Sequence, residues 1–344
     1  MGARIRSGIW FMAHREFTAD QIEIVAGGGV RGIIWLCAGI AVFSMQDVII
    51  KSLSGAYPLT EIVFLRSMIG APLLLAAVGI DPAPPTLRTR HRLLNLVRSA
   101  LAFASYMSFY LALAEMSLAE TVAIGFSAPL FITLLSALFL GERVGPARWA
   151  AVLVGFGGML AITRPGVASF QPAAGLALVC AVCYSGSQLL TRKIGRSDSG
   201  ALMSLYTAMF YLAVSAGLGL VLGGGAFAGS SHPSAAFLFR AWVVPDVGDM
   251  ALMLSTGAIS AFGFYALAQA YRVGEASIVA PFEYSGLFWA LLWGFVIWGE
   301  MVDGLAGLGM VAIVGSGLYV IVREQRRQRP LVSRRGRLRM RSGY

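Results

Sequence analysis

Six ionisable residues lie inside long apolar stretches of this sequence, and they are the first candidates for chemistry. They are Asp47, Lys51, Glu61, Arg66, Arg98 and Glu283. A charge at the centre of a membrane-spanning helix costs roughly 2.5–3.5 kcal/mol on insertion scales, so such residues usually face a cavity or a partner. An arginine in that setting can hold a carboxylate, and an acid can bind a cation or carry a proton.

The two arginines have a binding role and a structural role open to them. Arg66 lies about two turns inside its apolar stretch, where it could hold a substrate carboxylate or pair with Asp47 or Glu61 as a clamp. Arg98 shares one helical face with Tyr106. A cation next to aromatic rings suits a planar or carboxylate-bearing substrate, and helix–helix packing is the alternative. We predict Arg66, Arg98 and Tyr106 as substrate-binding residues.

Two of the acids are candidates for coupling transport to a cation or a proton. Glu283 follows Pro281, whose ring removes a helical hydrogen bond, and an acid beside freed backbone can bind a cation. Its alternative role is to pair with Arg98. Asp47 is the second candidate, although its spacing to Lys51 also fits an intrahelical ion pair. The remaining predicted substrate-binding residues are Glu283, Tyr284 and Gln188.

The composition shows what kind of element must position these residues. The chain has 344 residues, of which 57% are hydrophobic and 13% charged, and its mean hydropathy is +0.74. Soluble domains are about 45–50% apolar and about 25% charged. A disordered chain is therefore excluded, and a polytopic membrane protein is expected. At about 20 residues per span, ten helices fit, with a loop over 223–249. The predicted spans are 33–52, 58–79, 92–114, 118–140, 147–163, 173–192, 200–222, 250–271, 276–298 and 304–322.

The 27 Lys and Arg residues, which give a net charge of +10, follow the predicted topology. With the N-terminus inside, only Lys51, Arg164 and Arg240 fall in outer segments. The positive-inside rule then predicts that both termini are cytoplasmic. The basic run over 323–344 is expected to lie on anionic lipid headgroups. It lacks interleaved aromatic residues, so we expect no nucleic-acid partner.

An internal repeat appears when the sequence is offset by 158 residues, from position 141 to position 299. Gly141-Glu142 then falls on Gly299-Glu300, and Ser127 falls on Ser285. Each copy holds five predicted helices, and an odd number gives the second copy the opposite topology. Inverted repeats of this kind are typical of secondary transporters, which bind substrate near the midplane.

Several motifs in both copies resemble the EamA-type repeat. The first copy has Ala128-Pro129, Leu140-Gly141-Glu142-Arg143 and Gly155-x-Gly157-Gly158. The second has Ala280-Pro281-Phe282-Glu283-Tyr284, Gly299-Glu300 and Gly315-x-Gly317-Leu318-Tyr319. From about residue 33 to 324, the chain resembles the drug/metabolite transporter superfamily. The resemblance implies an all-α membrane protein in which ten helices form two inverted five-helix repeats around a central cavity. The expected divisions are an N-terminal tail (1–32), a first repeat (33–166), a second repeat (172–322) and a basic tail (323–344).

The function implied by this resemblance is secondary transport of a small organic metabolite by alternating access. We expect an amino acid or related zwitterionic compound as cargo. A flat heteroaromatic metabolite such as riboflavin or S-adenosylmethionine is the alternative, and a membrane-embedded enzyme is more remote. We expect no catalytic activity, since the predicted spans contain no histidine. Cys180-x-x-Cys183 has no second Cys/His pair, so no metal site or cofactor is predicted.

The expected setting is the inner membrane of a bacterium. The apolar spans indicate the membrane, and the excess of Arg over Lys indicates a GC-rich bacterial source. Protons are the candidate coupling ions. The glycines of spans 147–163 and 304–322 are expected to be close-packing sites within a monomer or on the face of a homodimer.

Overall fold

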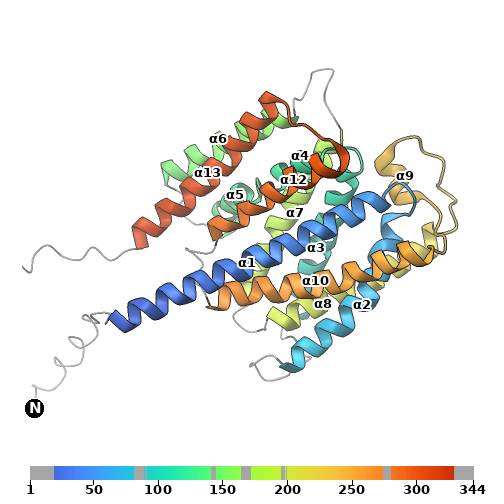
Figure 1. Ribbon diagram of the computed structural model, residues 1–344, viewed down its shortest axis with the longest axis horizontal. Helices are drawn as coiled ribbons and strands as arrows, with labels where there is room; N and C mark the ends of the chain where they lie inside the picture. Colours follow the sequence, from blue (N-terminus) through green and yellow to red (C-terminus); the bar gives the residue numbers. More distant parts are fainter. Residues whose placement is uncertain are drawn as a thin grey trace, which may run out of the picture.

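The computed structural model describes residues 19–80, 89, 91–140, 145–163, 172–194, 198, 200–273 and 280–328, and every regular element among them is helical (Figure 1). The first half of the chain contains α1 (Ala19–Leu53), α2 (Leu59–Ile80), α3 (Arg92–Leu113), α4 (Leu118–Gly125), α5 (Ala128–Leu140) and α6 (Pro146–Thr163). The second half contains α7 (Ala173–Ile194), α8 (Gly200–Leu222), α9 (Pro233–Phe239), α10 (Val247–Val273), the 3-10 helix η1 (Ala280–Tyr284), α12 (Ser285–Trp298) and α13 (Gly304–Gln328).

These helices account for the ten predicted spans. Six of the described segments are long and apolar enough to cross a membrane: Val30–Leu53, Leu59–Gly79, Arg92–Leu113, Ala173–Thr191, Gly200–Leu222 and Val247–Leu267. Four shorter apolar segments fall on the other predicted spans: Leu118–Ile132, Trp149–Thr163, Phe282–Trp298 and Gly304–Tyr319. The protein is therefore an all-α polytopic membrane protein, as the composition predicts.

The packing of the helices has the symmetry expected of an inverted repeat. The 158-residue offset places α3 on α10 and α6 on α13, and by their order in the two copies α1 corresponds to α7 and α2 to α8. The main packed pairs are α3 with α7, α1 with α10, α2 with α8, and α6 with α13. Exchanging the two copies converts the first pair into the second and leaves the other two unchanged. Figure 1 shows α1 alongside α10 and α6 alongside α13.

The two spans predicted as continuous helices over 118–140 and 276–298 are both broken, so this part of the prediction was wrong. In the first copy α4 ends at Gly125, because Pro129 has no N–H to donate to the carbonyl four residues earlier. In the second copy η1 contains Pro281 and gives way to α12 at Ser285. Ser127 and Ser285, which the repeat superimposes, both lie at the breaks.

Three other helix bounds differ from the prediction. The helix α1 begins at Ala19, inside the predicted tail, and α13 continues to Gln328. The predicted loop over 223–249 contains α9, which begins with a proline that is preorganised for the first helical position. Its Phe237 is 1% exposed, so burial of this ring helps to hold the short helix in place.

The pair of α6 and α13 is held together by glycines, as the sequence predicts. A Cβ atom on Gly158 would lie 2.6 Å from the carbonyl oxygen of Gly309, and one on Gly309 would lie 2.5 Å from that of Gly158. The backbones therefore meet with no room for side chains. The outward face of the pair is apolar, with Leu308 and Val311 largely exposed, as expected for contact with lipid.

Candidate substrate-binding site

A buried cluster of polar side chains lies between α1, α2, α3, α8 and α10, and Arg66 of α2 is its only described cation. Arg66 is 7% exposed. Its guanidinium carbon lies 4.5 Å from the ring centre of Tyr106 on α3 and 5.9 Å from that of Tyr211 on α8. Aromatic ring faces carry negative charge density, so they stabilise a buried cation that has no carboxylate beside it.

Arg66 makes neither of the ion pairs that the sequence left open. Within the described residues, neither Asp47 nor Glu61 lies within ion-pair distance of its guanidinium. Glu61 instead accepts a hydrogen bond from the backbone N–H of Val243 at 3.3 Å. The Nη1 of Arg66 and the hydroxyl of Tyr106 are buried and have no hydrogen-bond partner in the described part of the chain. Buried donors normally have partners, so these two atoms are candidate contacts for a ligand oxygen.

Asp47 of α1 occupies the other side of the tyrosine pair. Tyr110 donates a hydrogen bond to Asp47 Oδ1 at 2.6 Å, and its ring centre lies 4.5 Å from that of Tyr106. The Nε2 of Gln46 donates to the Tyr110 hydroxyl at 2.9 Å, and Ser260 donates to Gln46 Oε1 at 2.6 Å. This network joins α1, α3 and α10, and it places an acid beside Tyr110 while Arg66 lies over the neighbouring ring of Tyr106.

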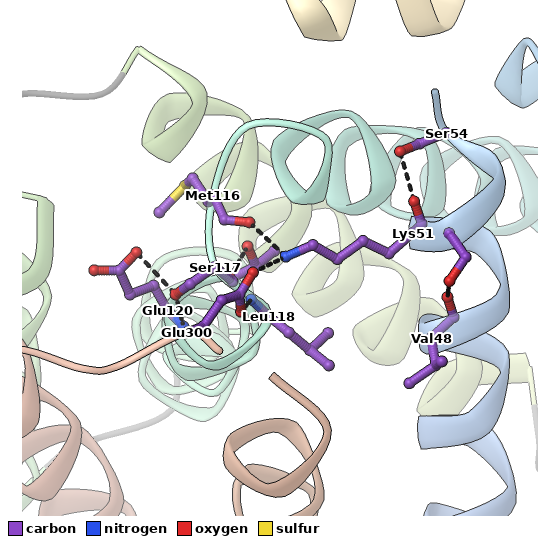
Figure 2. Close-up of polar contacts among 10 residues, drawn as sticks. Val48, Lys51, Ser54, Met116, Ser117, Leu118, Glu120 and Glu300 are labelled. Atoms are coloured by element: carbon purple, nitrogen blue, oxygen red, sulfur yellow. Dashed lines mark hydrogen bonds and ion pairs between the residues drawn. The ribbon is translucent and has the colours of Figure 1, made fainter. Parts of the chain in front are cut away.

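The predicted pairing of Asp47 with Lys51 is not present. Lys51 instead forms an ion pair with Glu300, in the connection between α12 and α13 (Figure 2). Since Glu300 lies far away in the sequence, no local spacing rule could have indicated this partner.

Arg98 is equally buried, but its Nε and Nη2 both donate to protein acceptors. Its Nε donates to Asn95 Oδ1 at 3.1 Å, and its Nη2 donates to the carbonyl oxygen of Met203 and to the hydroxyl of Thr207, the latter at 2.7 Å. Asn95 also donates to Asp198 at 3.2 Å. These contacts join α3 to α8. They fit the alternative in which Arg98 packs helices against each other rather than binding substrate.

The predicted residues of the second copy gather at its helix break. Glu283 is exposed, and Tyr284 packs edge-on against Phe126 of the first break, with ring centres 5.2 Å apart. The Tyr284 hydroxyl has no described hydrogen-bond partner. A Cβ atom on Gly317 would lie only 1.7 Å from this hydroxyl, so the glycine leaves the room that the hydroxyl occupies. Gln188 on α7 is partly buried. The two helix breaks therefore meet, and the residues predicted around Glu283 lie at that meeting point.

Sequence reasoning missed Tyr110, Tyr211 and Ser260. Tyr110 follows Tyr106 by one helical turn, and this spacing could have pointed to it. Nothing local indicates Tyr211 or Ser260, because they reach the cluster from helices in the second copy. The Gly141-Glu142-Arg143 motif lies outside the described residues.

Comparison with known proteins identifies the class. Residues 30–164 match the EamA-like transporter family. Together with the helix count, the paired breaks and the symmetric packing, this match shows that the first part of the chain is similar to the EamA-like transporter family. The chain is a multi-pass membrane protein and a small-molecule transporter.

Named relatives and a solved structure agree with this assignment. The chain is 27% identical to a riboflavin transporter of Rhizobium johnstonii, over 92% of this chain and 99% of that one. It is 29% identical to the pseudopaline exporter CntI of Pseudomonas aeruginosa, over 82% and 93%. It is 25% identical to an S-adenosylmethionine uptake transporter of Rickettsia bellii, over 86% and 94%. A crystal structure of a 20% identical protein shares the fold, with a TM-score of 0.59 over 88% of this chain and 98% of that one.

Proposed function

We propose that this chain carries a small zwitterionic metabolite, such as an amino acid derivative, across a bacterial inner membrane by alternating access. The observation that supports this most directly is Arg66, a buried cation with an unpartnered Nη1 above the ring of Tyr106. Helices from both copies surround it, which is where inverted-repeat transporters bind substrate.

The chemistry of the cluster matches the two ends of a zwitterion. The planar guanidinium of Arg66 suits a carboxylate, with the Tyr106 hydroxyl as a second donor. Asp47, beyond the tyrosine pair, suits an ammonium group. The rings of Tyr106, Tyr110 and Tyr211 form an aromatic wall that could pack against the body of the molecule.

A flat heteroaromatic cargo is the second candidate, and the same tyrosines favour it. Aromatic rings stack on flat ligands, and similar chains include riboflavin and S-adenosylmethionine transporters. S-adenosylmethionine satisfies both descriptions, because it joins an amino acid end to an adenine ring. Riboflavin has no carboxylate, so the role of Arg66 separates the two candidates.

Asp47 and Glu283 are the proposed coupling acids, with protons as the coupling ion. Asp47 lies inside the site, and Glu283 lies at the break beside Tyr284. In this proposal Glu283, Tyr284 and Gln188 act on the substrate from the side of the second copy. Arg98 acts by positioning α3 against α8.

The test is uptake into liposomes that contain the purified protein. Three radiolabelled substrates are compared: S-adenosylmethionine, riboflavin and a mixture of amino acids, each with and without an inward proton gradient. The proposal expects uptake of a carboxylate-bearing compound that is lost in Arg66→Gln. Uptake of riboflavin alone, at a rate that Arg66→Gln leaves unchanged, would contradict it and support the flat-cargo alternative. Uptake that neither responds to the gradient nor falls in Asp47→Asn or Glu283→Gln would remove the coupling role.

A further inference from the structure

One end of the helix bundle is closed by a polar contact that joins the two copies of the repeat. Lys51, near the end of α1, forms an ion pair with Glu300, which follows α12. Lys51 also donates to the carbonyl oxygen of Met116 at 3.1 Å, and Glu300 accepts from the backbone N–H of Leu118 at 2.8 Å. Figure 2 shows the lysine reaching across from α1 to this point. The four groups tie α1 and the α3–α4 connection to the α12–α13 connection.

The sequence around Glu300 is shaped to place its carboxylate there. Gly299 ends α12 in the left-handed conformation, with φ of 65°, which favours glycine. A Cβ on Gly294 would lie 2.9 Å from Glu300 Oε2, so a side chain at that position would push the carboxylate away. The Gly-Glu pair of the repeat therefore has a physical role here: the glycine makes the turn, and the glutamate binds across the copies.

The ion pair is shielded from solvent and covers an apolar layer. The side chains of Lys51 and Glu300 are 11% and 20% exposed, and the ammonium lies 4.8 Å from the ring centre of Trp298. Buried apolar side chains of α1, α2, α3, α4 and α12 form one cluster at this end of the bundle, including Ile50, Leu53, Leu113, Leu118 and Ala290. The ion pair therefore lies next to a buried apolar layer at this end of the bundle.

We propose that the Lys51–Glu300 pair is the latch that holds this end of the transporter closed, and that it opens during each cycle. The inference rests on the alternating-access function proposed above. The distribution of Lys and Arg places this end outside the cell. Breaking a contact present only in the outward-closed state shifts the population toward the outward-open state.

The test follows access to a buried cysteine, so it needs no knowledge of the cargo. Ala290, which is 2% exposed, is changed to cysteine after Cys37, Cys180 and Cys183 are replaced by alanine. A membrane-impermeant maleimide is then applied to whole cells and, separately, to inside-out vesicles. This design keeps the result independent of transport activity, so failure of the latch and failure of the proposed function are distinguishable.

Lys51→Ala and Glu300→Gln are each expected to raise the labelling rate in whole cells roughly tenfold, whereas the charge-preserving Lys51→Arg should stay within about twofold of the parent. Glu120→Gln is the matched control. It removes a carboxylate from the same region, one that accepts a hydrogen bond from Ser117 at 2.9 Å and takes no part in the ion pair.

Three results would overturn the proposal. The first is unchanged labelling in whole cells for both Lys51→Ala and Glu300→Gln when both elute as monodisperse protein. The second is an increase seen only in inside-out vesicles. The third is an equal increase from both sides, which would show that the pair only stabilises the fold. If Lys51→Ala does not fold, the near-isosteric Glu300→Gln decides the outcome alone.

Discussion

Arg66 and Arg98 are equally buried, at 7% exposure each, yet their surroundings differ completely. The guanidinium of Arg98 donates to a side-chain amide, a backbone carbonyl and a hydroxyl. The guanidinium of Arg66 faces two aromatic rings, and one of its nitrogens has no described partner. Burial alone would rank the two residues together, whereas their partners separate them.

The difference indicates which region supports the fold and which has capacity for a ligand. A cation whose donors bind acceptors of the protein stabilises the helices that supply those acceptors. A cation with an unused donor destabilises the empty site, and a ligand that provides the missing acceptor recovers that free energy. We therefore propose a packing role for the Arg98 region and a substrate-binding role for the Arg66 region.

The largest expected effect is that of Arg66→Gln on transport. If Arg66 holds the substrate carboxylate, its loss costs about 2–5 kcal/mol of binding, so transport should fall at least ~30-fold. The melting temperature without ligand should stay the same or rise, because no protein hydrogen bond of Nη1 is lost. Uptake in liposomes and thermal unfolding in detergent measure the two quantities. A transport loss explained entirely by a lower melting temperature would remove the contrast with Arg98.

Asp47→Asn sharpens the comparison within the Arg66 region. Asparagine can still accept the hydrogen bond from Tyr110, but it cannot carry a proton. We expect gradient-driven uptake to fall to the rate seen without a gradient, while exchange of labelled for unlabelled substrate continues. The same pair of assays on Glu283→Gln shows which acid couples transport. Gradient-driven uptake that persists in both variants would exclude both acids.

The sequence predicts the class of fold well, because apolar length, basic residues and the 158-residue repeat are one-dimensional signals. It also picks out Arg66, Asp47 and Tyr106, since ionisable and aromatic residues stand out in apolar helices. It does not separate Arg66 from Arg98, because that distinction depends on Met203 and Thr207, which lie on a helix more than 100 residues away.

The partner of Lys51 was missed for a similar reason. The local i, i+4 spacing favours Asp47, but the turn at Gly299 brings Glu300 from the other copy of the repeat. The helix breaks were also missed, since hydropathy is continuous through Ser127 and Ser285. The proline in each copy was the available signal.

Arg98→Gln should affect stability more than transport. Losing the hydrogen bonds of a buried guanidinium costs about 1–3 kcal/mol. The melting temperature should therefore fall by roughly 5 °C. Transport per folded molecule, measured at a temperature where the variant is stable, should stay near that of the wild type. A normal melting temperature together with a large rise in KM would instead show that Arg98 contacts the substrate.

The smallest expected effects come from removing single tyrosine hydroxyls. Tyr211 donates to the carbonyl oxygen of Ala102 at 2.7 Å, so Tyr211→Phe should cost about 1 kcal/mol of stability. The Tyr106 hydroxyl has no described partner, so Tyr106→Phe should leave stability unchanged and raise KM about fivefold. Thermal unfolding and uptake kinetics of the two variants test this. Equal effects on stability would contradict the assignment of Tyr106 to the ligand.

The most direct test of the account is ligand-induced thermal stabilisation of Arg66→Gln and Arg98→Gln, side by side in detergent. Carboxylate-bearing metabolites are first screened for one that raises the melting temperature of the wild type. We predict that Arg66→Gln keeps its unliganded melting temperature and loses this shift, whereas Arg98→Gln starts lower and keeps the shift. The reverse pattern, with stabilisation retained in Arg66→Gln and lost in Arg98→Gln, would contradict the placement of the substrate at Arg66.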